Sequence, residues 1–193
     1  WTYTWAGLDV KKSGVNIVYS VREITAIDGY TTTVTGDAET GFTIKNSYTG
    51  GTLTGLDNIT KIGGLSIGSE ENPAANETLE MVSMTKLNEV TGNIHVYNNG
   101  VKFVQFDLLK AIEGDFVISS STLTTLQIPE LINVGGALNI FGMGKGAIST
   151  LVFPKVQTVK NSLSINEIST LKSISFPELI ETGSINFSSL PIE

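Results

Sequence analysis

The sequence contains no cysteine and a single histidine in 193 residues. Without cysteine, disulfides, thiol catalysis and thiolate metal sites are excluded. With His95 alone, a metal site built from several histidines is excluded, and a catalytic triad has only one possible base. No apolar run approaches the ~20 residues that a membrane-spanning helix needs. We therefore expect no metal, no cofactor and no insertion into a membrane.

Positive charge is also scarce. Lys and Arg total 12 against 19 for Asp and Glu, a formal net charge of −7, which opposes nucleic acid or an anionic bilayer as a partner. The length permits one domain or two small ones with a real core. The chain opens on Trp1 without a signal-peptide pattern and stops at Glu193 within a repeat rhythm, which predicts a piece of a longer protein.

The first fifty or so residues are typical of β-structure. Alternation of polar residues with β-branched and aromatic ones predicts strands at 15–23 and 41–46, with Gly and Asp residues between them for turns. Residues 48–52 resemble an exit linker because they are rich in Gly and Thr. Two domains follow from this boundary, at residues 1–49 and 50–193.

The second region repeats itself. The clearest copies are residues 126–134, 151–159 and 174–182, each with a first strand, a proline and an apolar turn. A short second strand follows each copy, and the steps between second strands from Ile94 to Ile185 are 22, 22, 25 and 22 residues. These second strands begin at Leu65, Ile94, Phe116, Leu138, Leu163 and Ile185. Steps of this length are typical of leucine-rich repeats.

One such unit cannot bury its own apolar side, but stacked units share a continuous core between parallel sheets. The pattern therefore predicts an all-β solenoid. Pro129, Pro154 and Pro177 recur just after the first strand, where a missing N–H costs little because the ladder is ending. Two insertions, 69–77 and 141–147, lengthen their rungs and are expected as loops on an edge that often binds ligands.

Four short motifs occur in a fixed order in the first region. They are Trp1-Thr2-Tyr3-Thr4-Trp5, Tyr19-Ser20-Val21-Arg22-Glu23, Gly29-Tyr30 and Gly41-Phe42-Thr43-Ile44-Lys45-Asn46. In this order and spacing they make residues 1–49 resemble the C-terminal half of a collagen-adhesin B-type (CnaB-like) domain of Gram-positive surface proteins. The resemblance implies a partial, Ig-like β-sandwich.

The same resemblance implies residues for an internal Lys–Asn isopeptide bond. It assigns the promoting carboxyl group to Glu23 and the acceptor amide to Asn46, while the alternative is that both are ordinary polar residues at strand ends. In an apolar surround a neutral lysine can attack such an amide without a cofactor. The lysine of the family lies on a first strand that this chain lacks, and Lys11 and Lys12 lie in the middle of the matching region. We therefore expect no bond in this chain.

The repeats carry a unit of the form Leu-x-x-Leu-x-x-Pro-x-Leu-x-x-Val-x-x-x-Leu-x-Ile, most clearly at residues 123–140 and 148–165. In this they are similar to receptor L-domain-like and leucine-rich cell-surface arrays. The resemblance implies a right-handed β-solenoid with rungs of 22–25 residues. It also implies a module that binds proteins or glycans, or that spaces other modules.

Few residues of the repeats point to chemistry. His95 alternates outward between two apolar residues, which favours a surface position over a general base. The insertion at 141–147 is rich in Gly but lacks the Gly-Lys-Ser/Thr of a phosphate loop. The outward positions of both strands are small, polar and nearly uncharged, which suits a glycan, a protein loop or plain solvent. No aromatic residue is expected on them. The candidate ligand-binding residues are His95, Tyr97, Asn139, Phe141 and Lys145.

Together these features predict a non-enzymatic fragment of an extracellular, cell-wall or cell-surface protein, with an adhesive repeat module on a stalk-like sandwich. The alternatives are an accessory region of a larger surface hydrolase and a purely structural spacer. The expected partner is an extracellular protein or glycan. Self-association is also expected, because the uncapped last rung near Glu193 exposes an apolar edge.

Overall fold

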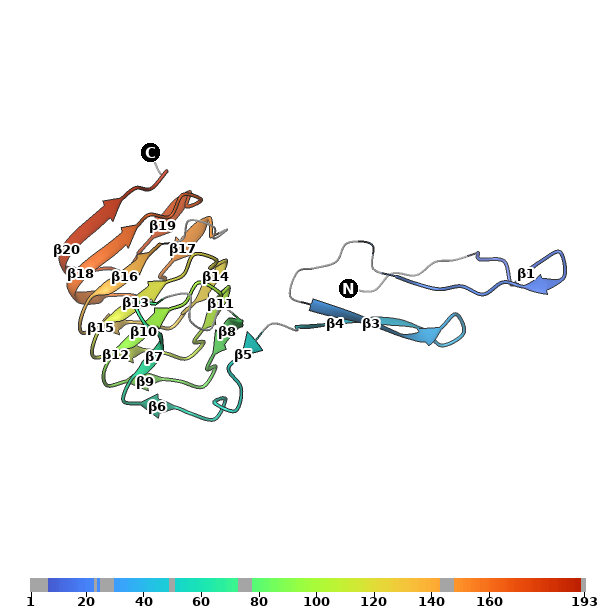
Figure 1. The fold of residues 1–193 in the computed structure, drawn as a ribbon, viewed down its shortest axis with the longest axis horizontal. Coiled ribbons are helices and arrows are strands. Elements are labelled where there is room, and N and C mark those ends of the chain that lie inside the picture. The colour runs from blue at the N-terminus through green and yellow to red at the C-terminus, as the bar shows by residue number, and fades with distance from the viewer. Residues whose placement is uncertain are drawn as a thin grey trace. The chain divides into compact units, whose positions relative to one another are not determined.

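A computed structural model of the chain describes residues 7–22, 24, 30–48, 51–72, 78–142 and 148–191. Every regular element in these ranges is a β-strand, so the expected all-β class is confirmed (Figure 1). The chain divides into two compact units, residues 1–49 and 50–193. The first is a small sheet region and the second is a β-solenoid.

The N-terminal unit holds two separate antiparallel hairpins. Strand β1 (Lys11–Lys12) pairs with β2 (Val15–Asn16), and β3 (Tyr30–Asp37) pairs with β4 (Gly41–Tyr48) along their whole length. The strand predicted at 41–46 is therefore confirmed. Among the described residues, the one predicted at 15–23 forms only at Val15–Asn16. Ile17 N–H still donates to Val10 O at 3.0 Å, but residues 17–22 pair with no described strand, and Glu23 lies outside the described residues.

The turn between β3 and β4 is organised by one carboxylate. Asp37 Oδ1 accepts hydrogen bonds from the backbone N–H of Glu39 at 2.9 Å and from both the N–H and the hydroxyl of Thr40, at 2.7 and 2.8 Å. The hydrogen bonds from Thr40, and then that from Glu39, lower the pKa of Asp37. Gly41 follows with φ +93°, a conformation that a side chain would strain.

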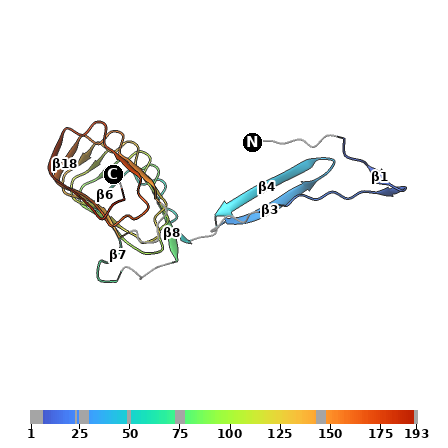
Figure 2. The same ribbon diagram turned by 90° about the horizontal axis from the view of Figure 1, so that it is seen from above.

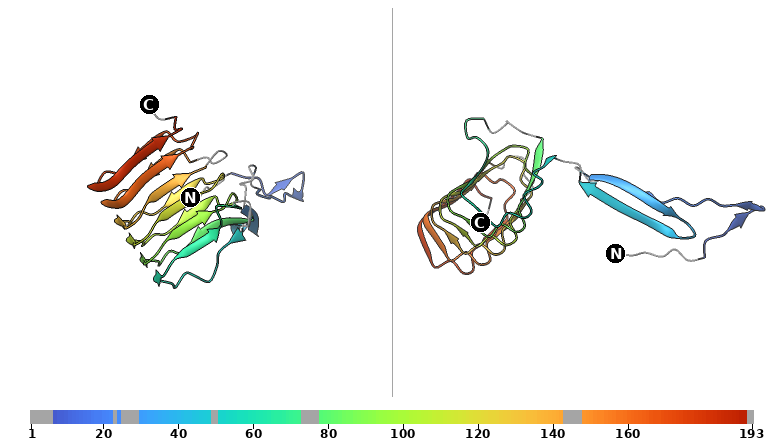
Figure 3. Two further views of the ribbon diagram at one scale, coloured as in Figure 1. Left: turned by 60° about the vertical axis from the view of Figure 1, so that its left-hand side comes forward. Right: turned by 90° about the horizontal axis from the view of Figure 1, so that it is seen from below.

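The solenoid stacks its rungs through three parallel ladders (Figures 1 and 3). The first ladder contains β5 (Gly51–Thr52), β8 (Leu79–Ser83), β11 (Phe103–Gln105) and β14 (Thr125–Gln127), and its line continues in β17 (Thr150–Val152) and β19 (Ser173–Ser175). The corner ladder contains β6 (Lys61–Ile62), β9 (Glu89–Val90), β12 (Ala111–Ile112) and β15 (Asn133–Val134). The second ladder contains β7 (Leu65–Gly68), β10 (Ile94–Tyr97), β13 (Phe116–Ser119) and β16 (Leu138–Phe141). In the last rungs β18 (Thr158–Asn166) and β20 (Glu181–Ser188) run through both the corner and the second ladder.

The register of the second ladder is the one that the repeats predict. Ile94 pairs with Leu65 and Phe116, and Leu138 continues the row to Leu163. Seen along the stack, the rungs superpose as loops around one interior (Figure 2). The corner ladder was not predicted, because two-residue strands carry no period-two pattern.

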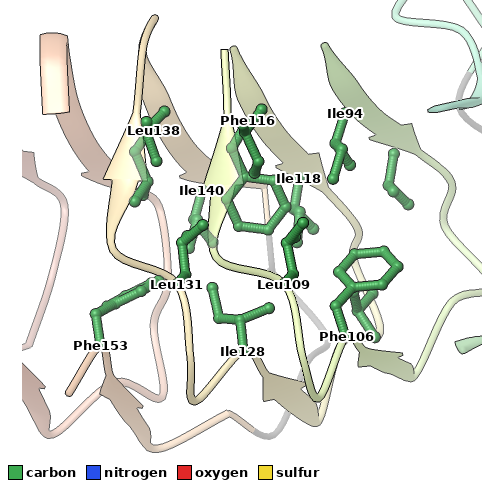
Figure 4. Packing of buried hydrophobic residues seen from close by; sticks show 14 of the residues in the cluster. Ile94, Phe106, Leu109, Phe116, Ile118, Ile128, Leu131, Leu138, Ile140 and Phe153 are labelled. Atoms are coloured by element: carbon green, nitrogen blue, oxygen red, sulfur yellow. The ribbon is translucent and has the colours of Figure 1, made fainter. Parts of the chain in front are cut away.

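Apolar side chains from all three walls fill this interior. Ile94, Phe116 and Leu138 of the second ladder point inward toward Phe106 and Ile128, which follow first-ladder strands (Figure 4). Their side chains are almost completely buried. Burial of this kind contributes ~1.5–3 kcal/mol for each large side chain, and it is available only when a neighbouring rung covers the residue.

Two of the bends in each rung are explained by particular residues. After the first ladder, four-residue turns such as Ile128 to Leu131 are closed by a backbone hydrogen bond, here 3.3 Å from Leu131 N to Ile128 O. Pro129 occupies the second position of this turn, where its fixed φ is favourable. Between the corner and second ladders the rungs approach so closely that a Cβ on Gly114 would lie 2.8 Å from the carbonyl carbon of Gly92. At Gly114 the bend therefore requires glycine.

Candidate ligand-binding face

The outer face of the second ladder consists of two rows of side chains, because alternate residues of each strand point away from the core. We call these the inner-strand row and the strand-end row. The inner-strand row contains Ser66, His95, Val117, Asn139, Ser164 and Asn186. The strand-end row contains Gly68, Tyr97, Ser119, Phe141, Asn166 and Ser188. None of the twelve positions is Asp, Glu, Lys or Arg, so the face is uncharged when His95 is neutral.

Two aromatic side chains lie on this face, which corrects the expectation that the outward positions lack them. The sequence pattern ends the second strand one residue too early, whereas β10 ends with Tyr97 and β16 with Phe141. Both therefore belong to the strand-end row, with Ser119 between them. The structure brings together four of the candidate residues, His95, Tyr97, Asn139 and Phe141, on one surface.

The ring of Tyr97 is supported by its neighbour on the same strand. The His95 and Tyr97 rings meet edge to face, with centroids 5.8 Å apart and planes inclined by 62°. Such aromatic contacts restrict both rings. Burial, with smaller contributions from the negative charges of Glu70 and Asp115, raises the pKa of Tyr97. Its hydroxyl is therefore a hydrogen-bond donor throughout the neutral range.

Asn139 carries an unsatisfied polar group at the centre of the face. Its Oδ1 atom is buried and accepts no hydrogen bond from the described residues. An unsatisfied buried acceptor typically costs ~1–3 kcal/mol. Its neighbour in the inner-strand row, Val117, is only 6% exposed, so the middle of the face has an apolar floor.

Polar groups farther along the stack are satisfied within the protein. Asn166 Nδ2 donates to Ser164 Oγ at 2.6 Å, and Asn166 Oδ1 accepts from both the N–H and the hydroxyl of Ser188, at 3.1 and 2.9 Å. The region around β10, β13 and β16 is thus the part of the face where aromatic rings and a free acceptor coincide.

Comparisons with known proteins fit the two regions separately. The model of the Cna protein B-type domain matches residues 1–47. A collagen adhesin of Staphylococcus aureus is 43% identical over 49 residues, which is 25% of this chain and 4% of the relative. Cell wall protein ecm33 of Schizosaccharomyces pombe is 30% identical over 125 residues, 62% of this chain and 23% of the relative. The chain thus spans less than a quarter of either relative. No solved structure matches it.

The residues implied by the CnaB resemblance are only partly visible. Asn46 lies on β4, where its backbone pairs with Thr32, and its side chain is outside the described residues. Glu23 and, in the repeats, Lys145 also lie outside them. Lys11 and Lys12 form β1 and are exposed. The isopeptide assignment therefore stays a prediction.

A shallow slot that the sequence did not predict interrupts the first ladder. β14 is the edge of a four-stranded sheet, and β17 and β19 form a sheet of their own. The slot between these sheets has a volume of about 220 Å³ and is lined by Leu126, Gln127, Ile128, Pro129, Val152 and Pro154. The 25-residue step was the only signal in the sequence, because it lies between these two rungs.

In the described residues no three His, Asp or Glu side chains cluster as a metal would require, and no helix is long and apolar enough to cross a membrane.

Proposed function

We propose that this chain is a non-enzymatic binding module of a cell-surface protein. Its ligand, an extracellular protein or glycan, would bind on the outer face of the second ladder. The observation that carries this is the combination found there: two aromatic rings beside an amide oxygen that is buried without a hydrogen-bond partner, on a face that contains no Asp, Glu, Lys or Arg. Aromatic residues are enriched at binding surfaces, and charged ones are depleted from their centres.

The names of the two relatives support the location and the class. One is a collagen adhesin and the other a cell wall protein. Neither name describes an enzyme, which favours binding over the accessory region of a hydrolase. The regular apolar repeats support membership of the leucine-rich, receptor L-domain-like arrays, in which a right-handed coil is expected.

Binding to a panel of purified extracellular-matrix proteins and glycans tests this proposal. The whole chain is immobilised and compared with two matched double variants. One places charge on the second ladder, as His95→Glu with Asn139→Glu. The other places the same charge two rungs apart on the outer row of the first ladder, as Ser83→Glu with Gln127→Glu.

We expect a saturable ligand that the second-ladder variant loses and the first-ladder variant retains. If both variants lose binding, or if only the first-ladder variant does, the binding site is not on the outer face of the second ladder. No binding across the panel would favour the purely structural spacer.

The N-terminal unit is proposed as part of a stalk, on the match to the Cna protein B-type domain. By this resemblance Glu23 and Asn46 would promote and accept an isopeptide bond once an upstream lysine is present. Mass spectrometry of a chain extended upstream should then show the loss of one ammonia, whereas the present chain should keep its full mass. An extended chain of full mass would contradict the assignment.

Self-association is also proposed, and the exposure of β20 supports it. Ile185 and Phe187 of β20 are 58% and 42% exposed, although they continue the row that Leu163 and Ile165 bury completely in the rung before. We expect a second copy of the chain to cover this edge. Light scattering should show a dimer that Phe187→Lys converts to a monomer; a monomer before substitution would contradict this.

A further inference from the structure

Two aromatic residues of the strand-end row are separated by one small residue. Tyr97 and Phe141 lie two rungs apart, and the only residue between them in the row is Ser119. Neighbouring strands lie ~4.8 Å apart, so the two aromatic residues leave the sheet ~9.6 Å from each other. We call this arrangement of Tyr97, Ser119 and Phe141 the aromatic notch.

The dimensions of the notch suit one flat ring. A ring that contacts aromatic carbons on both sides at ~3.5–4 Å needs ~7–8 Å between them. Side chains on a sheet stand roughly perpendicular to it, so the two rings flank the space above Ser119. Aromatic residues on adjacent rungs would pack on each other and leave no such space. The small Ser119 side chain occupies little of the space between the two aromatic residues.

The walls of the notch are held in place by their own neighbours. The ring of His95 contacts that of Tyr97 at 5.8 Å, and Gly68 lies on the other side of Tyr97 in the row. Both aromatic residues are half-buried, which restricts their motion. A ligand would therefore meet walls that lose little conformational entropy on binding.

The polar groups around the notch favour a ligand rich in hydroxyl groups. Asn139 lies on the same strand as Phe141, two residues before it and on the same face, and its Oδ1 has no donor among the described residues. The terminal torsion of an Asn side chain is soft, so this acceptor can turn toward a donor above the sheet. Ser119 and Tyr97 add two hydroxyl groups.

The charges near the notch oppose an acidic ligand. The face itself is uncharged, and the charged residues that act on Tyr97 are Glu70 and Asp115, both negative. An acidic ligand would be repelled by these carboxylates.

We infer that the aromatic notch is a subsite for a single ring of a neutral glycan, whose apolar C–H faces contact Tyr97 and Phe141 and whose hydroxyl groups donate to Asn139. This rests on the proposed binding function and specifies the ligand class of the same face. A sugar ring has the required combination, since its two faces carry C–H groups and its rim carries hydroxyls.

This is tested by titrating the whole chain with neutral hexasaccharides of glucose, mannose and N-acetylglucosamine. Binding is measured by calorimetry and by saturation-transfer NMR. A hexamer of galacturonate serves as the acidic comparison. Tyr97→Ala and Phe141→Ala each remove one wall, and Phe103→Ala removes an outward aromatic residue of the first ladder as a matched control. Ser119→Phe fills the notch without removing a wall, and Ser83→Phe, the same substitution on the outer row of the first ladder, is its control.

We expect at least one neutral sugar to bind, with affinity reduced at least about fivefold by Tyr97→Ala, Phe141→Ala and Ser119→Phe but not by either control. Unchanged urea midpoints would show that the variants fold. The inference is overturned if no neutral sugar binds, if only the acidic sugar binds, or if the three variants bind as the parent chain does. If a protein ligand binds the parent chain but not the variant with His95→Glu and Asn139→Glu, the proposed binding function holds without the glycan subsite. If no protein or glycan binds the parent chain, both the binding function and the glycan subsite are contradicted.

Discussion

The two units of this chain contain similar apolar residues but bury them to very different extents. In the N-terminal unit Val18 and Ile24 are 92% and 89% exposed, whereas in the solenoid Ile94 and Leu109 are completely buried. The difference lies in what covers each residue. Every inner rung of the solenoid is covered by a rung on either side, while β1 and β2 form a sheet that no other described strand joins. Stacking, more than composition, decides where stability resides.

Removing a core side chain should give the largest contrast between the units. Phe116→Ala is expected to lower the free energy of unfolding of the solenoid by ~3–5 kcal/mol, because a fully buried ring leaves a cavity. Urea denaturation followed by circular dichroism measures this. Val18→Ala, in the N-terminal unit, should change stability by less than ~0.5 kcal/mol. Equal effects at the two positions would contradict the comparison.

A methyl group added where rungs approach closely should have the next largest effect. Gly114→Ala is expected to destabilise the solenoid by ~1–3 kcal/mol, because its Cβ would overlap the Gly92 backbone and the Asn93 side chain. Gly63 is a matched control at the same bend of the first rung, where a Cβ would meet nothing within 4 Å. Gly63→Ala should be neutral or stabilise by up to ~1 kcal/mol. A similar loss at both glycines would show that the close approach is not the cause.

These contrasts also show what the sequence could predict. The period of the repeats predicted the register of the second ladder, because each rung must place its apolar residues on the same side as its neighbours do. Alternation at 15–23 predicted a strand that, among the described residues, forms only at Val15–Asn16. Alternation indicates which residues could be buried, but it does not show whether a partner strand is present. The corner ladder was missed because Glu89–Val90 and its equivalents are too short for any pattern.

The candidate site was predicted as residues but not as an arrangement. His95 and Asn139 were expected to point outward, as they do. Tyr97 and Phe141 were singled out, yet their place in the strand-end row depends on where β10 and β16 end, which a pattern fixes only to within a residue or two. The slot beside Leu126 depends on how one long rung is accommodated, and nothing in its composition indicates that.

An ion pair between rungs should give a smaller effect. Lys155 Nζ lies 2.6 Å from Glu130 Oε1 and joins the turns on either side of the slot. Both side chains are partly exposed, so their coupling energy should be only ~0.2–1 kcal/mol. A double-mutant cycle of Lys155→Met and Glu130→Gln, measured by urea denaturation at low and high salt, checks this. A coupling energy that does not fall with salt would contradict a solvent-exposed pair.

The smallest effect is expected in the N-terminal unit, at the turn that Asp37 organises. Hydrogen bonds from Thr40 and Glu39 favour the ionised carboxylate and lower its pKa. A carboxyl group whose pKa is lower in the folded chain than in the unfolded chain stabilises the turn fully at a pH above the unfolded pKa. This stabilisation is lost as the pH falls through the folded pKa. NMR titration should therefore show the Thr40 amide signal shifting below the usual aspartate range. Asp37→Asn should abolish that shift while the signals of the β10 and β13 ladder residues stay unchanged. A titration of the Thr40 amide at the ordinary aspartate pKa would mean that the turn does not stabilise the ionised carboxylate. The turn would then no longer distinguish this hairpin from the exposed strands β1 and β2.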